Sequence, residues 1–201
     1  MIGIIDYGAG NVHAITRILR NLKVHHKVVR NPSDFSEITK LILPGVGSFD
    51  SVMKKLNNSG LRDSLDDLVI NKHMSVLGIC VGMQIMGNNS EEGVLKGLGW
   101  INGSVIKFDN KKSIYVPHMG WNKVENEKGF SIFDETDKDF GFYFVHSYFF
   151  NLLENVDHVA STDYGFSFVS AFQKENIIGV QFHPEKSHSN GVRVFEKFCF
   201  K

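Results

Sequence analysis

The sequence is poor in cysteine and carries no net charge, and each of these shortages excludes a class of protein. Only two cysteines, Cys80 and Cys199, occur in 201 residues, which is too few for a disulfide framework. We therefore expect a reduced, cytoplasmic compartment, in which a well-placed cysteine can act as a nucleophile. Basic and acidic residues number 22 each, so charge gives no argument for a nucleic-acid or anionic-membrane partner.

Long apolar runs and secretion signals are also missing. The longest apolar stretches, such as Ile177 to Phe182, are far too short to span a bilayer. The N-terminal residues MIGIIDYG lack the basic region that begins a signal peptide. We therefore expect no membrane partner and no signal peptide.

Nucleotide-binding and metal-binding motifs are incomplete. Residues 8–10 (Gly-Ala-Gly) follow an apolar stretch as in a dinucleotide fingerprint, but His13 occupies the place of the third glycine. The next apolar stretch runs into Arg30 and Asn31 without the acidic residue that the fingerprint requires. The nine histidines show no metal-ligand spacing with a pair of cysteines. We expect no cofactor and no metal.

Strands and helices are expected to alternate in the first half of the chain. The apolar pattern predicts strands over 2–5, 24–29, 41–43 and 76–79, and helices over 12–22, 52–56 and 61–70. Pro44 and Gly45 are expected to end the third strand, and Gly87 to Asn89 to cap the helix that follows the fourth. Because these strands are almost continuously apolar, we expect a parallel sheet covered on both faces.

The second half is richer in strands. They are expected over 101–108, 142–149, 158–160, 168–173 and 177–182, with a last helix over 192–200 in which Cys199 packs. Glu175 and Asn176 are expected to form a hairpin turn. The whole pattern predicts a single α/β domain over residues 1–201. It is a three-layer sandwich with a mostly parallel central sheet and an antiparallel extension.

Cys80 stands in the stretch Gly78-Ile-Cys80-Val-Gly82, where a strand is expected to end and a helix to begin. A nucleophile elbow places a small residue two positions before and two after the nucleophile, because the turn is too sharp for larger side chains. The first amides of the helix would favour a thiolate, and the N–H of Val81 could bind an oxyanion. The alternative is a buried structural cysteine at a glycine-rich helix start.

A nucleophilic cysteine needs a base that is itself held in place. His183 ends the strongest strand of the second half, and sites in α/β proteins collect at strand ends. In an extended chain Glu185 would point to the same side as His183, which predicts a Cys–His–Glu triad. The alternative is that 183–185 is only a turn after an edge strand.

A second glycine-rich strand end lies at 43–49. Its glycines would allow the backbone to supply another amide to the oxyanion, and the alternative is a plain turn between a strand and a helix.

Together these motifs resemble those of the class I (triad) glutamine amidotransferases, whose fold is flavodoxin-like. Besides GICVGMQ, PGVGSF and HPEKS, the chain carries DYGAGN (6–11), SEEG (90–93), GLGWI (97–101), VPHMGWN (116–122) and FVHSY (144–148). The stretch PHMGWN is the most discriminating. With it, the chain resembles the family of glutaminase subunits of imidazole glycerol phosphate synthase over essentially its whole length.

This resemblance implies specific roles. Cys80 would attack the side-chain amide of glutamine, His183 would pass the proton to the leaving ammonia, and Glu185 would orient His183. The implied oxyanion hole consists of Val46, Gly47 and Val81, with a peptide flip near Val46. The implied glutamine-binding residues are Gly45, Gln84, Glu92, Ser147 and Tyr148. Within this group, Glu92 would pair with the α-ammonium, and donors near Ser147 would bind the α-carboxylate.

The resemblance also implies a partner. In the family, ammonia passes through the interior of a separate (β/α)8-barrel cyclase subunit. That subunit makes imidazole glycerol phosphate and an aminoimidazole carboxamide ribotide in histidine biosynthesis. The positions implied to face it in the heterodimer are Asn11, Pro117, His118, Met119, Gly120, Trp121, Asn122 and Lys186. Trp121 could instead be an ordinary core residue.

Other uses of the same nucleophile stay open. A paralogous glutaminase would supply ammonia to another acceptor, as in a surface-sugar amidation pathway. A free-standing cysteine amide hydrolase would turn over without a partner and would not need Glu92. An inactive binding subunit would have no use for intact Cys80, His183 and Glu185.

Overall fold

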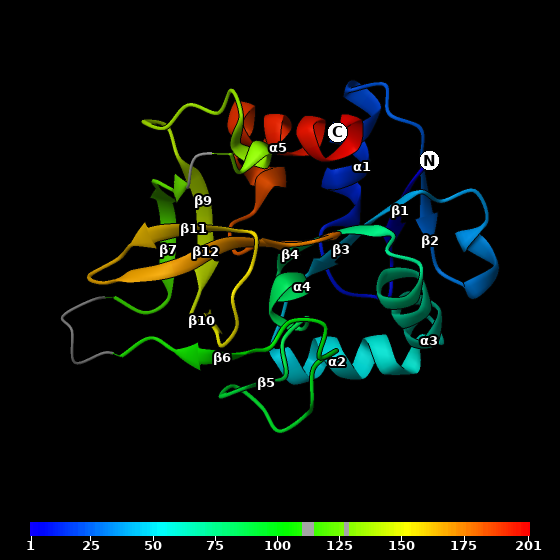
Figure 1. Cartoon of the computed structure of the whole chain (residues 1–201), viewed down its shortest axis with the longest axis horizontal. Helices are drawn as coiled ribbons and strands as arrows, with labels where there is room; N and C mark the ends of the chain where they lie inside the picture. The colour runs from blue at the N-terminus through cyan, green and yellow to red at the C-terminus, as the bar shows by residue number, and fades with distance from the viewer. Residues whose placement is uncertain (110–114, 127–128) are drawn as a thin grey trace.

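The computed structural model describes residues 1–109, 115–126 and 129–201, and a large mixed sheet runs through its centre (Figure 1). The parallel part consists of β1 (Ile2–Ile5), β2 (His26–Val29), β3 (Lys40–Gly45), β4 (Ser75–Cys80) and β13 (Ile177–Val180). These strands lie in the order β2-β1-β3-β4-β13. Because the carboxyl ends of parallel strands meet at one edge, the segments that follow β3, β4 and β13 come together there.

Antiparallel strands extend the sheet beyond β13. They are β12 (Ser167–Lys174), β10 (Tyr148–Leu152), β6 (Gly103–Lys107) and β11 (His158–Asp163), with the short strand β8 (Glu125–Asn126) at one margin. The short strand β5 (Asn89–Ser90) lies at another margin and pairs with β6 in parallel. A separate two-stranded sheet joins β7 (His118–Asn122) to β9 (Phe142–His146). The turn between β12 and β13 falls at 175–176, as the sequence predicts. The expected α/β sandwich with an antiparallel extension is confirmed.

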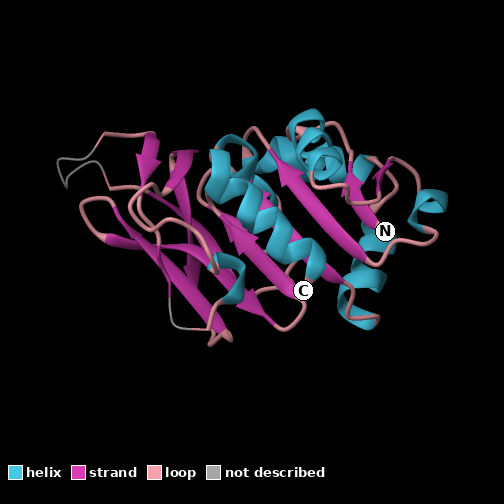
Figure 2. Cartoon of the chain, turned by 90° about the horizontal axis from the view of Figure 1, so that it is seen from above, coloured by secondary structure: helices cyan, strands magenta, loops and turns pink. Residues whose placement is uncertain are grey.

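Helices cover both faces of the parallel strands. Figure 1 shows α1 (Val12–Asn21) and α5 (His188–Phe200) on one side, and α2 (Phe49–Asn58) and α3 (Arg62–Asp66) on the other. The longer helices α1, α2 and α5 each bury an apolar stripe, such as Ile15 and Leu19 of α1, because apolar residues three or four positions apart share a helix face. Figure 2 shows that the helices gather over the half of the molecule that carries the N-terminus. Within the described residues, none of the helices has the length and apolarity that a bilayer crossing requires.

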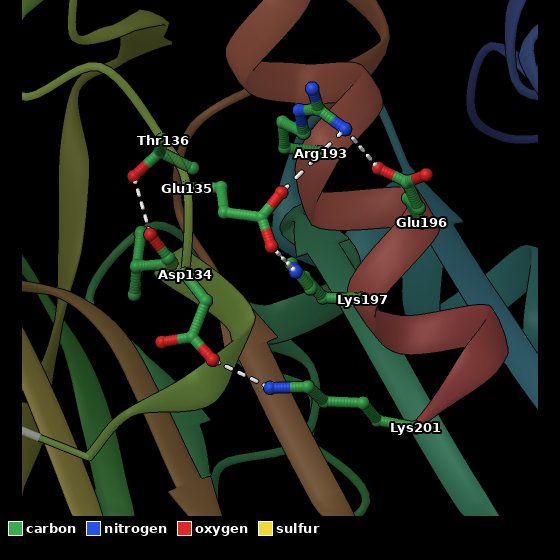
Figure 3. Close-up of polar contacts among 8 residues, drawn as sticks. Asp134, Glu135, Thr136, Arg193, Glu196, Lys197 and Lys201 are labelled. Atoms are coloured by element: carbon green, nitrogen blue, oxygen red, sulfur yellow. Dashed lines mark hydrogen bonds and ion pairs between the residues drawn. The ribbon is translucent and has the colours of Figure 1, made fainter.

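Ion pairs fasten α5 to the turn after the short helix η4 (Ser131–Phe133) (Figure 3). Asp134 binds Lys201, while Glu135 lies between Lys197 and Arg193. These side chains lie at the surface, where water and salt weaken each pair. They therefore set the position of the turn more than the stability of the fold.

Several expected boundaries are wrong. β3 includes Pro44 and Gly45, which pair with Ile79 and Cys80 of β4. The helix after Cys80, α4 (Val81–Gln84), has only 4 residues, because the backbone turns towards β5 well before the expected cap. The expected helix over 61–70 is split into α3 and a π-helical turn over 67–71. The expected strand over 142–149 is likewise two strands, β9 and β10, which belong to different sheets. The apolar pattern predicts no strand at β7, which the structure forms.

Candidate active site

Cys80 is the last residue of β4 and has a strained backbone. Its φ of 54° lies in the left-handed region, which residues with a Cβ rarely adopt. The turn brings Gly82 against β3 so closely that a Cβ there would overlap the carbonyl oxygen of Leu43. A Cβ at Gly78 would meet the carbonyl oxygen of Gly82 at 2.9 Å. The two glycines are therefore required by close packing of the backbone, as the elbow motif predicts.

His183 lies beside Cys80 and is tied to Glu185. Its Nδ1 is 2.9 Å from a Glu185 carboxylate oxygen, and both side chains are almost fully buried, at 3% and 2% exposure. The pair does not arise from an extended chain, as the sequence argument supposed. Instead β13 ends at Val180, and a short helical turn, η5 (Pro184–Lys186), places the carboxylate against the ring. The backbone N–H of His183 donates to Tyr143 of β9, which holds the ring in place.

The imidazole of His183 favours its charged form. Burial lowers the pKa of the ring. The charge and hydrogen bond of Cys80, together with those of Glu185, raise the pKa by more than burial lowers it, so the net shift is upward. The second carboxylate oxygen of Glu185 is buried and has no protein hydrogen-bond partner. The arrangement suits an imidazolium paired with a thiolate, which is the reactive form of cysteine.

Two buried glutamines connect the nucleophile to the opposite wall of the site. The side-chain amide nitrogen of Gln84, on α4, donates to the carbonyl oxygen of Tyr148 and to Gln181 Oε1, both at 3.0 Å. Gln181 Nε2 in turn donates to Cys80 Sγ at 3.7 Å. Both glutamines are buried, so every one of these contacts is shielded from water.

A pair of buried histidines continues this network towards β7. His146 Nδ1 lies 2.8 Å from the Tyr148 carbonyl oxygen, and His118 Nδ1 lies 3.0 Å from His146 Nε2. Since a carbonyl can only accept, His146 donates to Tyr148 and His118 donates to His146. Burial lowers the pKa of His118 to about 4 and that of His146 to about 3. Both rings are therefore neutral near pH 7.

The end of β3 runs alongside the nucleophile. Gly45 pairs with Cys80, so the next residue, Val46, enters the site, and its side chain is 51% exposed. The hydroxyl of Tyr7 donates to the Pro44 carbonyl oxygen at 2.5 Å. Burial and the nearby Cys80 charge raise the pKa of this hydroxyl well above its usual range, so it stays protonated. Tyr7 thus fixes the last part of β3 while the segment beyond it faces the cleft.

Glu92 is held by the start of α2. One of its carboxylate oxygens accepts a hydrogen bond from the backbone N–H of Phe49 at 2.8 Å. Asp50 holds the same loop from the other side, because it accepts hydrogen bonds from the N–H groups of Val94 and Leu95. The loop of Glu92 is therefore packed against the N-terminus of α2, where negative charge is favoured.

These groups open into one cleft of about 670 Å³. Of the residues predicted for the site from the sequence, the cleft is lined by Asn11, Val46, Gly47, Cys80, Val81, Gln84, Glu92, Pro117, Ser147, Tyr148, His183, Glu185 and Lys186. Gly45 and the segment 118–122 do not line it. Gly8 and Gly10 do, although no nucleotide fingerprint is present.

The predicted partner-facing residues separate into two groups. Met119 and Trp121 are exposed, at 61% and 43%, and Trp121 stacks on His188. His118 is only 3% exposed and stacks between Phe144 and Tyr164. Side chains alternate across a strand, so β7 presents one set outward and the other inward. The His118 side chain is therefore buried within this chain, and the expectation that its position faces a partner stays a prediction.

Two residues near the nucleophile escaped the sequence argument. Gln181 is a polar residue inside the apolar stretch 177–182, and that exception to the pattern was the available signal. His146 lies in the stretch FVHSY and also lines the cleft. Its contact with His118 depends on the pairing of β7 with β9, which no local pattern reveals.

Comparisons with known proteins agree with this geometry. A family model described as glutamine amidotransferase class-I matches residues 3–201. The imidazole glycerol phosphate synthase subunit HisH of Leptospira borgpetersenii is 48% identical, and the match covers 99% of each chain. The subunit of the same name from Bdellovibrio bacteriovorus is 46% identical, and the match covers 98% of each chain.

Solved structures show a similar fold. PurLQS from Thermotoga maritima superposes with a TM-score of 0.73 at 16% identity, covering 98% of this chain and 96% of that chain. A glutamine amidotransferase from the same organism gives a TM-score of 0.64 at 16% identity, covering 97% of this chain and 81% of the other. At these identities the similarity shows the fold alone.

Proposed function

The chain belongs to the class-I glutamine amidotransferase family, and from this premise we infer that it is the glutaminase subunit of an imidazole glycerol phosphate synthase. It hydrolyses glutamine to glutamate and ammonia, which is used in histidine biosynthesis. The relatives with this name match nearly the whole chain at 46–48% identity and are themselves subunits, so the chain works with a partner subunit.

One observation carries the chemistry. Cys80 sits on a strained turn at the floor of the cleft, and a buried His183–Glu185 pair lies beside its sulfur. A structural cysteine would need neither the strain nor the charged neighbours. A free thiol nucleophile also suits a reduced, cytoplasmic compartment.

In the reaction that we propose, the Cys80 thiolate attacks the δ-carbonyl carbon of glutamine. The C–N bond then breaks while the His183 imidazolium gives its proton to the leaving ammonia. The resulting glutamyl thioester is hydrolysed by a water molecule, whose proton His183 accepts, and glutamate leaves as the thiolate forms again. Glu185 keeps the imidazole oriented and stabilises its charge throughout, as the 2.9 Å contact allows.

The oxyanion formed in each step is assigned to backbone N–H groups. Val81 directly follows the nucleophile, so its amide is close to any atom bonded to Cys80 Sγ. Val46 and Gly47 also line the cleft and follow the residue that pairs with Cys80. A peptide rotation at this segment would aim the Val46 N–H at the oxyanion, which makes the hole adjustable.

The two ends of glutamine have matching groups in the cleft. One Glu92 oxygen is bound by Phe49, which leaves the other to pair with the α-ammonium. Gln84 uses its amide nitrogen on Tyr148 and Gln181, so its carbonyl oxygen is the end available for substrate. Donors near Ser147 and Tyr148 bind the α-carboxylate. A site that pairs both ends rejects simple amides, because its own buried groups would otherwise be left unpaired.

We assign the partner as a (β/α)8-barrel cyclase that receives ammonia at the rim of the cleft. Asn11, Pro117 and Lys186 line this cleft, and the exposed Met119 and Trp121 follow Pro117 closely in the chain. Exposed aromatic and methionine side chains are enriched at protein interfaces. Gly120 and Asn122 complete the segment that we place at the contact.

The test is glutamate release from glutamine by the purified chain, measured alone and with the cyclase encoded in the same genome and its ribonucleotide substrate. We expect low activity alone and strong activation in the mixture. Activity that ignores the cyclase would contradict the assignment, and it would favour the paralogous amidation pathway or a free-standing hydrolase.

Two variants make this experiment specific. Cys80→Ala should abolish glutamate release and leave synthesis with added ammonium salts intact. Cys199→Ala is the matched control, because this thiol packs in α5 and burial raises its pKa to about 12. Loss of ammonia-dependent synthesis in Cys80→Ala would refute the division of labour between the subunits.

A further inference from the structure

Gln181 is a fully buried polar side chain at the nucleophile, in a stretch that is otherwise apolar. It is 0% exposed, and its amide nitrogen lies 3.7 Å from Cys80 Sγ. A buried amide is costly unless its hydrogen bonds are satisfied, so an apolar residue would be the cheaper choice for packing alone. We therefore expect a role that depends on the hydrogen-bonding groups of the Gln181 amide.

The orientation of this amide is determined by its neighbours. Gln84 Nε2 can only donate, and it lies 3.0 Å from Gln181 Oε1, so the oxygen of Gln181 must face Gln84. The N–H end of Gln181 must then face the sulfur. Gln84 is itself fixed, because its other N–H donates to the Tyr148 carbonyl oxygen at 3.0 Å.

The Tyr148 carbonyl is in turn shared with the histidine pair. It accepts a second hydrogen bond from His146 Nδ1 at 2.8 Å, so both of its acceptor sites are engaged. His118 then donates to His146 at 3.0 Å. Each N–H bond in this hydrogen-bond network has one acceptor, which leaves Gln181 no alternative orientation.

Besides the His183 imidazolium, the usual source of stabilisation for such a thiolate is a helix N-terminus, and that source is weak here. The helix that follows Cys80 has only 4 residues, and a dipole that short contributes little at its N-terminus. An N–H group aimed at a thiolate forms a charge-assisted hydrogen bond, which is stronger than one between neutral groups.

We propose that Gln181 is a further catalytic residue, whose side-chain N–H donates to the Cys80 sulfur and stabilises it as a thiolate. It acts before attack on the amide, and again when the thiolate leaves the thioester. Gln84 acts as its positioning residue in addition to facing the substrate. This proposal rests on the proposed function only for the identity of the reaction that Gln181 would assist. The effect on the thiolate is a property of the free chain.

The test is the alkylation rate of Cys80 by iodoacetamide between pH 6 and pH 9, followed by mass spectrometry of the Cys80 peptide. Gln181→Met keeps the length of the side chain and removes the donor. We expect its rate at pH 7 to fall by about tenfold, as for the loss of one charge-assisted hydrogen bond, and its pH profile to move to higher pH. Gln173→Met is the matched control, since Gln173 binds the Glu175 carbonyl oxygen outside the cleft.

A second variant covers the case in which Gln181→Met fails to fold. Gln181→Glu still accepts from Gln84 but offers no proton to the sulfur when ionised, so alkylation at pH 8 should be slower than in the parent chain. A Gln181→Met or Gln181→Glu protein that is folded by circular dichroism and alkylates at the parent rate overturns the proposal. Alkylation needs neither glutamine nor a partner, so an absence of glutaminase activity even in the mixture with the cyclase and its substrate would refute the proposed function and leave this result standing.

Discussion

Acid should destabilise this protein through its buried histidine pair. The pKa values of His118 and His146 fall from 6.5 to about 4 and about 3 in the folded chain, mainly because of burial. Between pH 6.5 and pH 5 the unfolded chain therefore binds a proton on each ring that the folded chain does not bind. The free energy of unfolding rises with pH wherever the unfolded state holds more protons, so this stability is lost as the pH falls.

The magnitude follows from the width of this window. The unfolded rings are half protonated at pH 6.5 and almost fully protonated at pH 5, so the window of about 1.5 pH units gives somewhat less than the full slope of about 1.4 kcal/mol per unit. The loss is about 1.5 kcal/mol for each histidine and about 3 kcal/mol for the pair. His183 has the opposite shift, since its folded pKa is raised. The stability that it adds is fully present below pH 6.5 and is lost only as the pH rises through its folded value, so it adds no slope here. Most carboxylates titrate below this window.

The assay is urea unfolding at pH 6.5 and pH 5, in the parent chain and in His118→Phe. Phenylalanine can keep the stacking on Phe144 and Tyr164. Any constant cost of the substitution cancels when each variant is compared with itself at the two pH values. We expect the acid-induced loss to shrink by about half, and His13→Gln, at an exposed position, to leave it unchanged. Equal losses in the parent chain and in His118→Phe would refute the reasoning.

Three further outcomes follow from contacts at the site. Tyr7→Phe removes the donor to the Pro44 carbonyl oxygen, so the free energy of unfolding in urea should fall by about 1–2 kcal/mol. An unchanged midpoint would show that this hydrogen bond contributes nothing. Gly82→Ala forces a Cβ into β3 and should destabilise the fold by about 1–3 kcal/mol by the same assay, with a loss of Cys80 alkylation as the elbow is displaced. In Glu185→Gln the pKa of His183 should fall, because burial lowers it and only Cys80 then opposes that effect. An NMR titration of the His183 ring would measure this pKa. An unchanged titration midpoint in Glu185→Gln would show that the Glu185 carboxylate does not control the charge of His183.

Local signals were sufficient for the elbow at Cys80. The spacing of Gly78, Cys80 and Gly82 reflects a steric requirement within a few residues, and the structure meets it. The sequence also predicts that His183 and Glu185 lie beside Cys80, and they do, but the extended chain that it assumes for Glu185 is wrong. A helical turn brings its carboxylate to the ring, where an extended chain had been supposed. Two residues separated by one proline, such as His183 and Glu185, can contact each other in an extended chain or in a helical turn.

Long-range pairing explains what could not be predicted. Ser147 separates β9 from β10, and only the pairing partners of each strand reveal that they belong to different sheets. The burial of His118 has the same origin, since its neighbours come from 144–146 and 164. Pro44 within β3 was unexpected because proline lacks the N–H that a central strand usually donates.

The two tryptophans of the chain differ in exposure, so their intrinsic fluorescence can be used to follow binding of a partner. Trp100 is 6% exposed and donates its indole N–H to Asp66, so it is shielded from quenchers. Trp121 is 43% exposed and lies flat against His188, with an interplanar angle of 9°. Acrylamide should therefore quench Trp121 selectively. Because that indole stands in the segment that we assign to the partner contact, intrinsic fluorescence can report docking without any label.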